Sequence, residues 1–236
     1  MKTIINSLIR SINKLPEGKY PPEYFTPAVV RSYLFVSYGY PVGFIMHLSF
    51  IGVFFFIGVE ELALFNFISV SLWGIAILLN GKGYFWQGYL LVAFELISHA
   101  AICTVIIGWS NGFQYYLLQM PVAIFLVHWR TSTKILVAFV FTFAFMAINH
   151  YATVSTPYVV INPLYTAALN YGNILSTCFG MAVMGYIYYT ATRNIEEKLK
   201  IEHKRTNEAL MERNKLLDRL NLELADAAEY VRNILP

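Results

Sequence analysis

Charged residues are almost absent from the middle two thirds of this 236-residue chain. The stretch 32–192 contains three basic residues and three acidic ones, namely Lys82, Arg130, Lys134, Glu60, Glu61 and Glu95. The other 14 basic and 11 acidic residues lie in residues 1–31 and 193–236. The chain as a whole is 57% apolar and 13% charged, whereas a soluble domain carries about 25% charged residues. This distribution predicts a membrane protein and excludes an ordinary soluble enzyme or a nucleic-acid-binding protein.

Six apolar segments approach the length of about 20 residues that a membrane-spanning helix needs. They are residues 33–59, 62–79, 84–108, 113–128, 132–151 and 164–190. Long apolar runs without a two-residue alternation favour helices over a barrel. We therefore expect an all-α membrane protein whose domain 32–192 is a bundle of six transmembrane helices.

The basic residues predict the orientation of this bundle, because lysine and arginine collect on the cytoplasmic side of membrane proteins. With the N-terminus inside, all 17 basic residues fall on that side, and the external loops hold none. Both termini are therefore predicted to be cytoplasmic. The leader, residues 1–31, is expected to begin with an amphipathic helix over residues 1–15 that lies on the membrane surface.

The tail, residues 193–236, has a different pattern, with no glycine and a single proline at its end. Apolar residues recur there at heptad spacing, at Leu210, Leu217, Leu220, Leu224 and Val231, with Arg213 as one polar defect. Heptad spacing is typical of a coiled coil. We expect the sixth span to continue directly into a cytoplasmic helix that pairs in parallel with a second copy. Because this seam reaches the last residues, an output domain is expected to follow residue 236.

Ionisable side chains inside the hydrocarbon layer are costly and mark functional candidates. His47 lies in the first predicted span, Glu95 and His99 lie four residues apart on one face of the third, and His150 follows Asn149 in the fifth. At about 1.5 Å of rise per residue, all three histidines fall in the outer half of the bundle. One site could therefore hold them.

Three interpretations of these residues stay open. They form hydrogen bonds that hold the helices together, or a pocket for a small external or lipid-like ligand, or a haem or metal site. A haem b iron would take His99 and, opposite it, either His47 or His150, with a carboxylate behind one of them. The cofactor is therefore unassigned.

The connection between the third and fourth spans adds aromatic and amide side chains at the outer interface. These are Trp109, Asn111, Gln114 and Tyr115. They are interpreted either as an interfacial aromatic belt or as the mouth of the same outer site. No catalytic constellation occurs in the chain.

The chain resembles a bacterial sensor module in three features, namely Glu95-x-x-x-His99, the stretch GWSNGFQYYLL (108–118) and the direct passage into a tail helix. This six-helix module precedes class III adenylate cyclases and other signalling enzymes, and the likeness covers residues 30–200. The ending LNLELADAAEYVRNILP (220–236) is similar to the helix that enters PPM-type serine phosphatase domains and, less closely, to the one before cyclase domains.

The resemblance implies a sensor or anchor domain in a bacterial inner membrane. It would form a homodimer through its tail, contact lipids and a small ligand, and belong to a full-length phosphatase or cyclase. The alternative is a haem-b-binding redox or electron-transfer membrane protein.

Overall fold

In the computed structural model, which describes residues 27–127 and 129–234, every regular element is a helix. The elements are α2 (Pro27–Phe56), α3 (Glu60–Gly81), α4 (Phe85–Ile107), the 3-10 helices η2 (Trp109–Asn111) and η3 (Phe113–Leu118), α5 (Gln119–Leu126), α6 (Thr131–Val154) and α7 (Pro163–Ile234). The prediction of an all-helical protein is confirmed over this part of the chain. The amphipathic helix predicted over residues 1–15 lies outside it.

Four of these helical segments are long and apolar enough to cross a membrane. They are Phe35–Phe56, Glu60–Gly81, Phe85–Ile107 and Thr131–Val154. Each corresponds to one predicted span. The predicted and observed boundaries agree because Gly, Lys or polar turn residues end the apolar runs. Many large apolar side chains on them are exposed, such as Ile45, Phe94 and Phe139 at 60–65%. Such surfaces are suited to contact with lipid tails and would be unusual in a soluble protein.

The segment predicted as the fourth span is shorter and begins as a 3-10 helix, η3, before α5. Gly112, which precedes η3, has a φ of 82°, and a Cβ atom there would lie 2.8 Å from Oδ1 of Asn170. Only glycine suits that position. Pro121 lies in the first turn of α5, where its missing N–H costs no helical hydrogen bond. Together η3 and α5 extend roughly 24 Å, less than the hydrocarbon core of about 30 Å.

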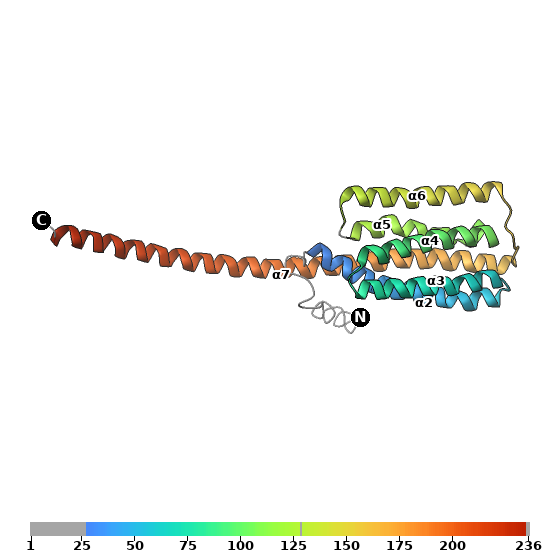
Figure 1. Ribbon diagram of the computed structural model, residues 1–236, viewed down its shortest axis with the longest axis horizontal. Coiled ribbons are helices and arrows are strands. Elements are labelled where there is room, and N and C mark those ends of the chain that lie inside the picture. Colours follow the sequence, from blue (N-terminus) through green and yellow to red (C-terminus); the bar gives the residue numbers. More distant parts are fainter. Residues whose placement is uncertain (1–26, 128, 235–236) are drawn as a thin grey trace. The chain divides into compact units, whose positions relative to one another are not determined.

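The helices pack side by side (Figure 1). Helix α2 packs on α3 and α3 on α4, η3 lies against both α4 and α6, and α5 lies against α6. The first part of α7 joins this bundle, since Leu169 is buried in a core cluster with Phe54 and Phe113. The buried face of α2 repeats at helical spacing, at residues 40, 47, 51 and 54. The spacing of this face brings His47 into the interior.

Helix α7 belongs to two compact units, one up to Tyr189 and one from Thr190 onward. In the second unit the described side chains from Leu199 onward are exposed. Ion pairs four residues apart, Arg193 with Glu197 and Lys204 with Glu208, are of the type that supports an isolated helix. Helix α7 runs without a break from the segment predicted as the sixth span into the tail.

Candidate functional site

Three ionisable side chains meet in the interior of the bundle. His47 comes from α2, and Glu95 and His99 come from successive turns of one face of α4. One ligand atom from each lies within 4.8 Å of the other two, and all three side chains are buried. We call these residues the His–Glu–His cluster. The sequence prediction that they share one site is consistent with this geometry.

Hydrogen bonds fix which nitrogen of His47 carries a proton. The Asn66 side chain donates from Nδ2 to the carbonyl of Leu62 at 2.8 Å, which turns its Oδ1 toward His47. Nδ1 of His47 lies 3.0 Å from that oxygen. Since an amide oxygen only accepts, Nδ1 must donate. The other nitrogen, Nε2, then faces Oε2 of Glu95 at 3.4 Å.

The carboxylate of Glu95 is held by neighbours from α3. The indole Nε1 of Trp73 donates to Oε2 of Glu95 at 2.9 Å. The hydroxyl of Ser69 also faces the carboxylate, although outside normal hydrogen-bonding geometry. Glu95 is 1% exposed. A carboxylate buried to that extent needs a compensating positive charge or a proton.

His99 has different surroundings, which are mainly aromatic. Its ring packs against the rings of Phe50, Phe65 and Phe113 at centroid distances of 6.1, 5.9 and 5.4 Å. The sulfur of Cys103, one turn further along α4, lies 3.8 Å from both ring nitrogens. A thiol is a weak hydrogen-bonding group. The ring of His99 is therefore positioned by packing, with its nitrogens weakly bonded.

A close approach between α2 and α3 positions the indole of Trp73. A Cβ atom at Gly43 would lie 2.3–2.5 Å from three carbon atoms of that ring. Any larger residue would push the indole away from Glu95. At Gly52 on the same helix, a Cβ atom would meet nothing within 4 Å.

The structure does not bring every predicted site residue to the cluster. Asn149 and His150 are exposed on α6, and His150 is not among the residues whose ligand atoms converge. Asn111 and Gln114 are buried, but their amide groups donate to the backbone, Asn111 to the carbonyls of Ile107 and Gly108 and Gln114 to that of Trp109. Tyr115 is half-buried, and its ring lies close to Gly112.

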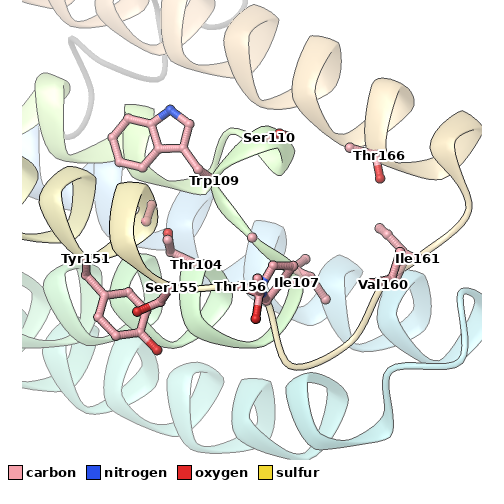
Figure 2. A pocket seen from close by; sticks show the side chains of 13 residues that line it. Thr104, Ile107, Trp109, Ser110, Tyr151, Ser155, Thr156, Val160, Ile161 and Thr166 are labelled. Carbon is pink, nitrogen blue, oxygen red and sulfur yellow. The ribbon is translucent and has the colours of Figure 1, made fainter.

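Trp109 lines a separate pocket of about 280 Å³ at the C-terminal end of α4. Figure 2 shows this pocket, with Tyr151 and Ser155 from the end of α6 and Thr166 from α7 at opposite sides of the view. Thr104, five residues after His99, also contributes to its wall. The pocket and the cluster are therefore built on neighbouring turns of the same helix.

Sequence reasoning missed three residues that contact the cluster from α3 and α4, namely Asn66, Trp73 and Cys103. A signal for the first two was present. Asn66, Ser69 and Trp73 recur at spacings of three and four within an apolar span, which places their polar groups on one face. Polar side chains on one face of a membrane helix are expected to point into the bundle.

The geometry of the two rings bears on the haem interpretation. The rings of His47 and His99 lie 4.7 Å apart between centroids and meet edge to face, at 85°. Two nitrogen ligands on opposite sides of one metal lie about 4 Å apart, and their rings extend further outward. A porphyrin between the two imidazoles would need both rings to move apart, so His47 and His99 do not fit haem in this arrangement. His150, the third candidate haem ligand, is exposed.

Comparison of the chain with models of protein families, with curated proteins and with solved structures finds no match.

Proposed function

We propose that this chain is the membrane-embedded sensor domain of a bacterial signalling protein, which transmits the state of the His–Glu–His cluster to a cytoplasmic output. The observation that carries this proposal is α7, one helix of 72 residues. Its first part packs in the bundle, and its later part carries an exposed apolar seam. A continuous helix that bears both is a suitable transmitter between an intramembrane site and a partner chain.

Six spans complete the membrane domain in this proposal. To the four long apolar helices we add η3 with α5 and the part of α7 up to Tyr189. The even number follows from the basic residues, which all fall on one side when both termini are cytoplasmic. The membrane is the inner membrane of a bacterium, as the resemblance implies.

A short series of contacts leads from the cluster to α7. The ring of His99 packs on Phe113 of η3. Three residues later, Tyr116 donates a hydrogen bond to Oδ1 of Asn173 on α7 at 2.9 Å. The amide of the same Asn173 donates to the carbonyl of Asn111 at 2.7 Å. A change at His99 would reach η3 through Phe113, and α7 through the hydrogen bond from Tyr116 to Asn173.

The exposed seam on the second part of α7 supports a partner in parallel register. Leu210, Leu217, Leu220, Leu224 and Val231 are 45–68% exposed in the single chain. Exposed leucines at heptad positions are buried when two such helices pair. We propose a homodimer through this seam, with a PPM-type phosphatase domain slightly favoured over a class III cyclase as the output. That ranking rests on the resemblance of the chain's last residues.

Thiol labelling in intact cells tests the proposed topology. Tyr158, 81% exposed in the segment between α6 and α7, is replaced by cysteine, as is the exposed Lys82 after α3. Both variants carry Cys178→Ser to remove the exposed native thiol. We expect an impermeant maleimide to label position 158 and not position 82 until the membrane is opened. Labelling of position 82 alone in intact cells would contradict the orientation.

A further inference from the structure

We infer that the His–Glu–His cluster is a binding site for one divalent first-row transition-metal ion, with His47, Glu95 and His99 as its protein ligands. This inference deepens the proposed function and rests on it in one respect, namely that occupancy of the site would be the sensed state. The metal site itself stands on the geometry of the three residues.

A nitrogen of His47 on α2 and an oxygen of Glu95 on α4 face each other. Because Nδ1 of His47 donates to Asn66, a neutral His47 presents a lone pair at Nε2 to an oxygen of Glu95 at 3.4 Å. Two lone pairs at that distance repel unless a proton or a metal cation lies between them. Two ligands of a tetrahedral metal, each at about 2.0–2.1 Å, lie roughly 3.3 Å apart. The observed separation fits a metal without movement of either side chain.

The third ligand is available in the same space. His99 is 3% exposed, and the only group within hydrogen-bonding distance of its ring nitrogens, among the residues that the structure describes, is the thiol of Cys103. One of these nitrogens lies within 4.8 Å of the other two ligand atoms. Movement of its ring by roughly an ångström or more toward them would bring this distance to the roughly 3.3 Å of a tetrahedral site.

Residues behind the ligands have the arrangement that metal sites use. A metal-bound histidine usually donates its other N–H to an oxygen, and a metal-bound carboxylate accepts further hydrogen bonds. His47 donates to Asn66, and Glu95 accepts from Trp73. These bonds fix the tautomer of the histidine and the direction of the carboxylate before any ion binds.

The donor set selects the class of ion. Two imidazole nitrogens and one carboxylate oxygen suit zinc, iron, cobalt, nickel or copper. Magnesium and calcium prefer sites made of oxygen atoms. The aromatic rings around His99 keep bulk water away from the ion and strengthen its attraction to the carboxylate.

Cobalt is the probe for the test, since bound Co²⁺ absorbs visible light and its spectrum reports the coordination geometry. The full chain, without a histidine tag, is purified in detergent, stripped with a chelator and titrated with Co²⁺. We expect one Co²⁺ per chain with the strong absorbance of a four- or five-coordinate site, abolished by excess Zn²⁺. Glu95→Gln, which preserves the shape of the side chain, should remove this binding.

Two further variants separate a ligand role from a folding defect. Trp73→Phe changes no ligand and should weaken Co²⁺ binding about 10- to 100-fold, as the loss of an outer hydrogen bond does at other metal sites. His150→Ala, a histidine on the exposed face of α6, should leave the titration unchanged. Thermal unfolding of each variant checks that the bundle remains folded.

A folded wild-type chain that binds no Co²⁺ and contains no Zn²⁺, iron or copper as isolated would overturn the inference and leave a proton between His47 and Glu95. Co²⁺ binding that survives Glu95→Gln would also overturn it. The proposed function fails separately. The proposed function is wrong if the metal binds as expected but pairing of the tails changes neither with the metal nor with Glu95→Gln. It survives if no metal binds but Glu95→Gln alters pairing of the tails.

Discussion

Replacement of Leu217 and Leu224 together by aspartate is expected to abolish cross-linking between the tails of two copies. The reporter is a disulfide between cysteines introduced at Val231, in a chain that also carries Cys178→Ser. Both leucines occupy the same heptad position as Val231, so pairing buries them against the partner helix. An unpaired charge buried at such an interface costs several kcal/mol. Two charges on each of two chains should therefore leave no measurable dimer through the tail.

The matched control is the pair Met211→Asp and Leu222→Asp. These two residues are 67% exposed, as apolar as the seam leucines, and lie on the opposite side of the heptad. The control adds the same charge to the same helix and should cross-link at the wild-type level. Equal loss in both double variants, or no loss in either, would contradict a paired seam at these positions.

Replacement of His47 by alanine is expected to lower the free energy of unfolding by about 3–5 kcal/mol, because it leaves the carboxylate of Glu95 buried without its partner. The double variant His47→Leu with Glu95→Leu removes both groups. It should recover part of this loss, with about 1–3 kcal/mol remaining for the unsatisfied indole N–H of Trp73. Unfolding in a mixture of mild and denaturing detergents gives these differences.

The size of this effect separates two interpretations of the cluster. Interhelical hydrogen bonds in membranes average about 0.6 kcal/mol. A cost of His47→Ala near that value, without recovery in the double variant, would mean that the cluster only holds the helices together. A cost of several kcal/mol with recovery would mean that a cation, either a proton or a metal, balances a charged carboxylate.

The sequence predicted the long helices well because each depends on a local property. Helices α3, α4 and α6 begin and end within three residues of the predicted spans. Apolar length between turn residues determines these boundaries, and it can be counted without knowledge of the neighbours. The fourth apolar segment was located as closely, at 113–128 against Phe113–Leu126. Its 3-10 beginning was not predicted, since it depends on the close approach of Asn170 from a distant helix to Gly112.

The positions of the candidate residues along their helices could be predicted, but not the directions in which their side chains point. Rise per residue gave the heights of His47, His99 and His150, but the face that a helix buries depends on its partners. On α6 the buried residues are Phe141 and Ile148, seven apart and so on one face. At about 100° per residue, His150 points well away from that face, which explains its exposure. The role of Asn111 could not be predicted for another reason, because an amide can form hydrogen bonds with either a ligand or the backbone.

The central claim is that the His–Glu–His cluster and the tail seam are coupled through α7. The most direct measurement is the equilibrium between thiols and disulfide at Val231→Cys in a glutathione redox buffer, which reports how closely two tails approach. Two comparisons are made. The wild-type chain is compared with Glu95→Gln. Gly43→Ala, which displaces Trp73, is compared with Gly52→Ala, which has free space for a methyl group. Coupling of about 1 kcal/mol or more predicts at least a fivefold change in the disulfide equilibrium constant for Glu95→Gln and Gly43→Ala. Gly52→Ala should leave it unchanged. The same constant in all four proteins, each folded, would contradict the account.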